Sequence, residues 1–347
     1  MNSLQIMRQG KLQLGPILLI IFMTLVLVGC GTKDAEQTDK AAPAEKATSF
    51  TGKIGGGPTG GTFNTFANGM SIYVPKNLAG VKLSAVGSGG SVENVKRVSS
   101  GESDFGLCYA VDSALGRGGL LPKDENKYDG TMAMGFLYGA PAQLIVRADS
   151  DFHTAKDLVG KKVAVGNAGS GAAASAERFF RHIGVWDNFS HQFLGYSAAA
   201  SAFKDGKIDA FWVLVGYPNS SVIEASVQVD IRLIDVGKDA VESKFYGAYA
   251  YIPVDIPAGT YGEGMPACSS FQDATFLCAN KGVPTDVVYN VMKTLWSTDG
   301  MAAMVAAKKT FKTMTLENAF DGASIPLHPG AVKFWQEHGK TVPADLK

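Results

Sequence analysis

Residues 81–110 read VKLSAVGSGGSVENVKRVSSGESDFGLCYA, and this stretch decides the fold class of the chain. Val81–Ser88 and Ser103–Ala110 are apolar runs typical of strands. Between them three valines recur at every third position, which is typical of a helix with one apolar face. A strand, a crossover helix and a second strand form the unit from which parallel sheets are built. The stretch therefore predicts an α/β protein.

The same alternation of strands and helices extends in both directions along the chain. The run IDAFWVLVG at Ile208–Gly216 lacks polar alternation, as expected of a strand that is buried on both faces. These patterns predict a mostly parallel sheet flanked by helices. The other expected strands are Phe50–Gly57, Lys161–Asn167 and Asp273–Asn280, and the other expected helices lie near Thr62–Tyr73, Gly171–Val185, Pro218–Val227, Pro284–Ser297, Asp299–Thr310 and Gly330–His338.

Two interruptions of this pattern indicate two lobes. The apolar run Met132–Arg147 is broken by Gly139-Ala140-Pro141, and residues 253–264, PVDIPAGTYGEG, are rich in turn formers. The late strand and the three helices after it suggest that the chain returns to its first lobe. We expect lobe I to comprise residues 50–140 and 253–347 and lobe II to comprise residues 141–252, with a ligand cleft between them.

The N-terminus has the pattern of a lipoprotein signal peptide. Arg8 and Lys11 precede the apolar run Leu12–Val28, and small residues lead to Cys30. We expect residues 1–29 to be removed and Cys30 to carry lipid. The alternative is a single-pass anchor that happens to end in cysteine. Residues 31–49 contain no aromatic and no β-branched aliphatic side chains, so this segment cannot bury enough surface to fold. We therefore expect residues 30–49 to be a disordered tether between the lipid and the domain.

Composition excludes several classes of protein. Of 347 residues, 46% are hydrophobic and 18% are charged, which is too apolar for a disordered protein. Lys and Arg together number 32, as do Asp and Glu, so no basic excess favours nucleic acid as a partner.

The cysteines and histidines do not suggest a metal site. Cys108 lies in an apolar run and is expected to be a small buried hydrophobe, while Cys268 and Cys278 are either a disulfide or two buried thiols. The four cysteines and five histidines offer no zinc motif, so we expect neither a metal nor a cofactor.

Three glycine-rich loops each follow a strand and open a helix. They are GGGPTGGTF at 55–63, GSGGS at 87–91 and GNAGSGA at 166–172. Backbone N–H groups at a helix N-terminus bind anions, and parallel sheets bind ligands beyond the carboxyl ends of their strands. The loops therefore predict a site for a small anion, although ordinary tight turns are the alternative.

Other side chains near the expected cleft are open to two interpretations. Aromatic residues at strand ends belong either to the core or to the cleft, and we expect one or two of them to line the cleft. Arg147 either pairs with a ligand carboxylate or caps a strand. We find no pairing of nucleophile and base that indicates an enzyme. The aromatic residues concerned are Tyr109, Tyr138, Phe211, Trp212 and Tyr217.

Several segments resemble the TAXI family of TRAP-transporter solute receptors. They are IGGGPTGGTF, GSGGSVENVKRVSSGESDFGL, LIVRADS with DLVGKKVAVGNAGSGA, AFKDGKIDAFWVLVGYPN, IPAGTY and LHPGAVKFWQEHG, and the similarity runs from about Lys53 to Gly339. The resemblance implies a type II-like periplasmic-binding-protein fold with the ligand between two lobes. It also implies a monomeric receptor in the periplasm that delivers its ligand to a fused TRAP membrane subunit.

The resemblance and the strand ends together give the expected ligand-binding residues. Phe63, Ala172 and the Gly139-Ala140-Pro141 segment depart from the family pattern, and each departure removes a polar group. This favours a dicarboxylate or 2-oxo acid over an amino acid, because a buried ammonium needs partners. The residues are Gly60, Gly61, Thr62, Phe63, Ser88, Gly89, Ser91, Tyr109, Tyr138, Ser170, Gly171, Ala172, Trp212, Gly216 and Pro218.

Two rival interpretations stay open. The receptor of an ABC importer shares the expected fold. A secreted lipoprotein enzyme on a two-lobe scaffold would need a nucleophile with its base, or a metal, in the cleft.

Overall fold

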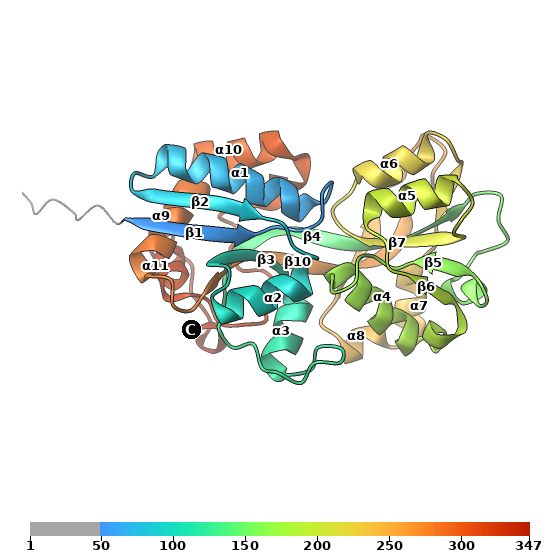
Figure 1. Ribbon diagram of the computed structural model, residues 1–347, viewed down its shortest axis with the longest axis horizontal. Helices are drawn as coiled ribbons and strands as arrows, with labels where there is room; N and C mark the ends of the chain where they lie inside the picture. The colour runs from blue at the N-terminus through green and yellow to red at the C-terminus, as the bar shows by residue number, and fades with distance from the viewer. Residues whose placement is uncertain (1–48) are drawn as a thin grey trace, which may run out of the picture. The chain divides into compact units, whose positions relative to one another are not determined.

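The structure is a computed structural model that describes residues 49–347. The expected signal peptide, the lipidated Cys30 and all but the last residue of the tether lie outside these residues. A ten-stranded sheet in the order β2-β1-β3-β10-β4-β7-β5-β6 forms the centre of the fold, with β8 paired to β4 and β9 paired to β10 (Figure 1). Helices cover both faces of this sheet, so the α/β class is confirmed.

The segment that decided the fold class forms the unit it predicted. β2 and β3 both pair with β1 in parallel, and α2 connects them. The helices α1 and α10 cover one face of this end of the sheet, while α2 and α3 cover the other (Figure 1). We call β1–β3 with α1–α3 the first half. The bounds are β1 Phe50–Gly55, α1 Thr62–Asn77, β2 Val81–Val86, α2 Ser91–Ser100, β3 Phe105–Tyr109 and α3 Ala110–Gly118.

A second group of short parallel strands lies at the other end of the sheet. β5 pairs in parallel with both β6 and β7, and the five residues of β7 are all buried, as the run IDAFWVLVG predicted. We call β5–β7 with α4–α6 the second half. The bounds are β5 Lys162–Ala164, α4 Gly171–His182, β6 Ser190–Gln192, α5 Tyr196–Lys204, β7 Ala210–Leu214 and α6 Ser220–Ser226.

Two long antiparallel strands connect the halves and make the sheet mixed. β4 spans Thr131–Arg147 and β10 spans Cys268–Asn280. Residues Thr131–Pro141 of β4 pair with β10, and the rest of β4 pairs with β7 and β8. The predicted break at Gly139-Ala140-Pro141 is wrong, because the strand continues through it. Pro141 has no N–H to donate, and it lies where β4 changes partner from β10 to β7.

Another difference concerns the turn-rich stretch after residue 252. Its first residues form β9, Ile252–Ile256, which pairs antiparallel with the first part of β10. The prolines there did not prevent a strand, because β9 is an edge strand with one partner. The other elements of this region are β8 Ile231–Leu233, α7 Val236–Glu242 and α8 Phe245–Ala248.

The three expected C-terminal helices are present and pack on the first half. α9 and α10 contact α1, and α11 contacts α9 and β4. Among residues 49–347, no helix has both the length and the apolar character that a membrane span requires. The lobe boundaries predicted above stay a prediction. The bounds are α9 Thr285–Leu295, α10 Thr298–Ala307 and α11 Pro329–Glu337, and the short 3-10 helices are Ala155–Leu158, Trp186–Asn188, Lys309–Thr313 and Ala344–Leu346.

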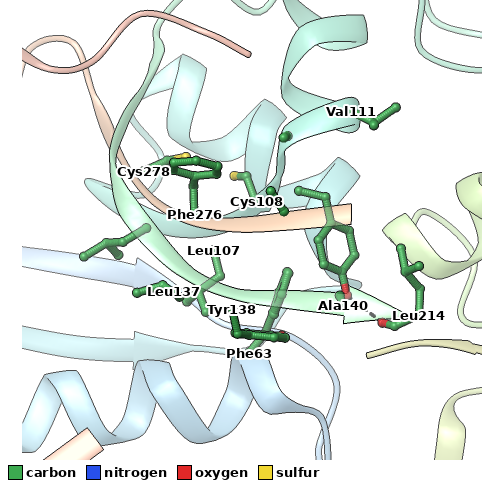
Figure 2. Packing of buried hydrophobic residues seen from close by; sticks show 14 of the residues in the cluster. Phe63, Leu107, Cys108, Val111, Leu137, Tyr138, Ala140, Leu214, Phe276 and Cys278 are labelled. Atoms are coloured by element: carbon green, nitrogen blue, oxygen red, sulfur yellow. Dashed lines mark hydrogen bonds between the residues drawn. The ribbon is translucent and has the colours of Figure 1, made fainter. Parts of the chain in front are cut away.

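The cysteines within the described residues are buried free thiols, so the disulfide alternative is wrong. Cys268 and Cys278 begin and nearly end the single strand β10. Ten residues of extended chain span about 33 Å, whereas a disulfide needs Cα atoms within about 7 Å. Cys278 instead lies near Cys108 of the neighbouring strand, on the side of β4 opposite Phe63 and Tyr138 (Figure 2).

Candidate functional site

One pocket lies where glycine-rich loops of both halves meet. Ten of the fifteen predicted residues line it, and its volume is about 40 Å³. The pocket therefore suits a small molecule. The predicted residues among its lining are Gly61, Thr62, Phe63, Gly89, Ser91, Tyr109, Tyr138, Ser170, Gly171 and Ala172.

Five helices begin at this pocket, because each follows a strand whose carboxyl end reaches it. The N-caps of α1 and α2 are Gly61 and Gly90, the N-cap of α3 is Tyr109, and the N-caps of α4 and α5 are Ser170 and Gly195. All five residues line the pocket. Gly61, Gly90 and Gly195 make no side-chain hydrogen bond to the first turn, so α1, α2 and α5 leave first-turn N–H groups without a side-chain partner. In α3 the N–H of Val111 already donates to the carboxylate of Asp273.

The charge of the pocket comes from the backbone. No Lys, Arg, Asp or Glu is among the described residues that line it. Helix N-termini carry a partial positive charge from their unsatisfied N–H groups, and those of α1, α2, α4 and α5 meet at the pocket, whereas Asp273 already pairs with the N-terminus of α3. The arrangement is therefore suited to an anion and offers no acidic partner to a cation.

Contacts across the pocket leave no room for larger side chains at its wall. The hydroxyl of Tyr109 in the first half donates a hydrogen bond of 2.6 Å to the carbonyl oxygen of Leu214 in the second half. A Cβ atom on Gly171 would lie 2.5 Å from Cδ2 of Tyr109 and 2.6 Å from Oδ2 of Asp112. Gly171 is therefore required so that α4 can approach the first half.

The tyrosines of the pocket remain protonated at neutral pH. Burial raises the pKa of Tyr109, Tyr138 and Tyr196, so each keeps a hydroxyl proton to donate. Tyr196 donates its proton to the carbonyl oxygen of Leu214 at 2.9 Å, the same acceptor that Tyr109 uses.

A buried cluster of charge lies behind the pocket wall. Arg178 of α4 forms an ion pair with Asp112 of α3, and both side chains are buried. Asp273 of β10 is also buried and accepts a hydrogen bond of 3.2 Å from the backbone N–H of Val111. Burial raises the pKa of Asp112, although Arg178 opposes the shift, and burial with the nearby Asp112 raises the pKa of Asp273 further.

Two predicted loop residues lie outside the pocket lining. Gly60 adopts φ +82° just before the lining begins, and a Cβ there would lie 3.4 Å from the hydroxyl of Ser197. Ser88 is occupied in its own loop, because its hydroxyl donates to the carbonyl oxygen of Gly56 at 2.8 Å.

Three predicted residues on β7 and after it also lie outside. Trp212 is a core residue, whose ring stacks on Phe179 and whose Nε1 donates to the hydroxyl of Ser175 at 3.0 Å. Gly216 lines a different cavity, beside Thr310. Pro218 precedes α6, which begins at Ser220 and not at Pro218, because the side chain of Asn219 caps it.

The remaining candidates from the sequence belong to the core or to helix ends. Phe211 is buried against Phe203. Arg147 donates to the carbonyl oxygen of Phe203 at 2.7 Å, near the C-terminus of α5, so its role is to cap a helix. The ligand-carboxylate alternative for Arg147 is not supported, since Arg147 does not line the pocket.

Two of the lining residues that the sequence missed come from one junction. Gly195 and Tyr196 follow β6, whose three residues Ser190–Gln192 are polar and gave no strand signal. The Gly-Tyr pair before an alanine-rich helix was the available signal. The other missed residues are Pro58, Gly90, Asn167 and Val215.

One family model matches most of the chain. Residues 54–339 match the model of the NMT1-like family. Among solved structures, the chain is similar to the aliphatic sulphonate binding protein SsuA from Escherichia coli, with 16% identity, coverage of 85% of this chain and 82% of that chain, and a TM-score of 0.46. It is also similar to a TctC solute binding protein from Polaromonas, with 17% identity, coverage of 78% and 88%, and a TM-score of 0.44.

Proposed function

The chain belongs to the NMT1-like family, and we propose that it is an extracytoplasmic solute-binding protein that holds a small organic anion and delivers it to a membrane transporter. The observation that carries this proposal is the convergence of the N-termini of α1, α2, α4 and α5 on one small pocket without charged side chains among its described lining. Such a site binds an anion through backbone N–H groups and hydroxyls.

The ligand class follows from the size and charge of the pocket. A cavity of about 40 Å³ favours a small acid over a nucleotide or a peptide. The candidates are a 2-oxo acid, a dicarboxylate and an acidic amino acid. The missing acidic partner favours an acid without an amine, because an unpaired buried ammonium is costly.

The protein acts as a binding protein and not as an enzyme in this proposal. The polar side chains of the pocket are hydroxyls and one amide, Asn167, and none of the lining residues within the described part of the chain is a histidine, cysteine or carboxylate that would act as a base. We therefore expect the bound molecule to leave the protein chemically unchanged.

The transporter is proposed from the resemblance to the TAXI family. On that basis the partner is a fused TRAP membrane subunit driven by an ion gradient, and the protein is a monomer held in the periplasm by lipid on Cys30. The second candidate is the receptor of an ABC importer, because the pocket chemistry is the same for both. Uptake by vesicles that contain the protein and its membrane partner separates them: an ionophore stops the first, and depletion of ATP stops the second.

The binding proposal is tested by the ligand itself. The protein is purified without refolding, and the molecules that it releases on denaturation are identified by mass spectrometry. We expect a small organic anion, and calorimetry should show that the same anion binds again to emptied protein. A neutral or cationic ligand, or a product that differs from the molecule supplied, would overturn the proposal.

A further inference from the structure

Three buried hydroxyls beside the pocket have no hydrogen-bond partner. Thr62 and Tyr138 are each 1% exposed and Thr275 is 0% exposed. The hydroxyl oxygens of all three lack a partner of acceptable geometry, although most buried polar groups in proteins have one. We call Thr62, Tyr138 and Thr275 the hydroxyl cluster.

The strand register places two members of the cluster side by side. Thr275 of β10 stands opposite Tyr138 of β4 and opposite Tyr109 of β3, so the three side chains form one row on the same face of the sheet. Thr62 is the first residue of α1, which covers that face. Tyr138, Tyr109 and Thr62 all line the pocket, and Figure 2 shows Tyr138 beside Phe63 of α1.

The members of the cluster are near enough to influence one another. Burial raises the pKa of Tyr138, while side-chain hydrogen bonding with the hydroxyls of Thr275 and Thr62 lowers it, although none of the three oxygens has a hydrogen bond of normal geometry. The phenol is therefore a protonated donor at neutral pH, and the two threonines can donate or accept. Unpaired groups of this kind favour any occupant of the pocket that supplies their hydrogen bonds.

We propose that the hydroxyl cluster forms a second subsite of the pocket, in which Thr62 and Tyr138 bind a neutral oxygen of the ligand, a keto or hydroxyl group, and Thr275 positions Tyr138 from the neighbouring strand, while the helix N-termini bind the ligand carboxylate. This inference rests on the proposed function and narrows the ligand to an acid that carries one further neutral oxygen.

The chemistry of the cluster argues against a charged group at this position. An ammonium would need a carboxylate, but Asp112 lies behind Gly171 and is paired with Arg178. A second carboxylate would bring another negative charge into a site whose described lining includes no Lys or Arg. A neutral oxygen accepts from the phenol and costs least to bury.

The first test is the melting temperature of the ligand-free protein. Thr275→Val and Tyr138→Phe remove unpaired hydroxyls, so we expect melting at or above that of the wild type. The matched control is Thr131→Val on β4, because Thr131 is equally buried and its hydroxyl donates to the carbonyl oxygen of Val95 at 2.8 Å. The control should melt lower. If Thr275→Val lowers melting as much as Thr131→Val, the hydroxyls are paired and the inference is wrong.

The second test compares acids that differ at one atom. Calorimetry is run with unsubstituted, 2-oxo, 2-hydroxy and 2-amino monocarboxylates of three to five carbons, and with succinate. We expect the wild type to bind the 2-oxo or 2-hydroxy acid at least tenfold tighter than the unsubstituted acid of equal length. In the double variant Tyr138→Phe, Thr275→Val this preference should fall below threefold.

The outcomes distinguish a failure of the proposed subsite from a failure of the proposed function. Tightest binding of a 2-amino acid or of succinate, or equal binding of 2-oxo and unsubstituted acids, overturns the subsite and leaves an anion receptor. If none of these acids binds, the proposed function fails for small carboxylates and the subsite fails with it. The melting comparison still decides whether the hydroxyls are unpaired.

Discussion

The guanidinium of Arg178 on α4 forms an ion pair with the carboxylate of Asp112 on α3, and this pair joins the two halves directly behind the pocket wall. A second carboxylate, Asp273, lies near the pair: burial lowers the pKa of Arg178, and the charge of Asp273 is among those that raise it. The cluster thus holds two acidic groups and one cation, all buried.

Loss of this cation should destabilise the protein. Arg178→Met leaves two carboxylates buried without a guanidinium, and removal of one partner of a buried pair costs about 3–5 kcal/mol. Unfolding in urea measures the loss. The control is Arg181→Met on the same helix, because Arg181 is 48% exposed and its surface ion pairs should contribute less than about 1 kcal/mol. Similar losses for both variants would contradict the assignment.

The pH dependence of stability should change when Asp273 is replaced by asparagine. The raised pKa means that the folded protein keeps a proton that the unfolded chain releases. The contribution of protonated Asp273 to stability is therefore present below the pKa of this residue in the unfolded chain, and it is lost as the pH rises through the raised pKa of Asp273 in the folded protein. Asp273→Asn does not ionise, so it should melt above the wild type at pH 8, with a difference that shrinks toward pH 4. A difference that is constant with pH would argue against this.

A methyl group on Gly171 should prevent binding. Its Cβ would lie within 2.8 Å of atoms of Tyr109, Asp112 and Ser91, so α4 could not approach the first half. We expect Gly171→Ala to weaken anion binding at least tenfold by calorimetry. Gly87→Ala is the control, because no atom lies within 4 Å of the added Cβ. Wild-type affinity in Gly171→Ala would show that the contact is dispensable.

The hydrogen bond from Tyr109 to Leu214 should contribute to affinity because it joins the two halves. Tyr109→Phe removes a bond of 2.6 Å. A net loss of about 0.5–1.5 kcal/mol corresponds to binding weakened about 2- to 12-fold. Tyr196→Phe removes a bond to the same oxygen from within the second half, so it should affect stability more than affinity. The reverse pattern would mean that the contact between the halves plays no part in binding.

Lipid attachment is a prediction about Cys30 that lies outside the described residues. Cys30→Ser should abolish incorporation of a labelled fatty acid, because Cys30 is the only thiol at the end of the signal-peptide pattern that could carry the lipid. Incorporation that persists in the variant would refute the lipoprotein assignment. The wild type grown with the same label is the control.

The fold was predictable where a residue pattern repeats locally. Apolar runs and valine spacing located β2, α2, β3 and β7, each within a few residues. The crossing strand β4 was misjudged, because Gly139 and Pro141 are turn formers in isolation and only the sheet shows that Pro141 needs no donor there. The pairing of β10 with strands far away in sequence has no local signal, so the mixed character of the sheet could not be foreseen.

The site was predictable from the loops but not from single side chains. Glycine-rich junctions located α1, α2 and α4 at the pocket. The sequence predicts Trp212 in the cleft because aromatic residues at strand ends serve either role, and its stacking on Phe179 is visible only in the folded chain. The unpaired state of Thr275 depends on neighbours from two other strands.

The five helix ends at the pocket have a consequence for how such a protein can evolve. Main-chain dipoles survive most substitutions, so the attraction for an anion is inherited with the fold and not with particular side chains. Related proteins that arise by mutation can then substitute the few side chains that contact the rest of the ligand without losing the ability to bind an acid. On this scaffold, a change of ligand specificity requires few substitutions, and each evolutionary intermediate still binds an anion.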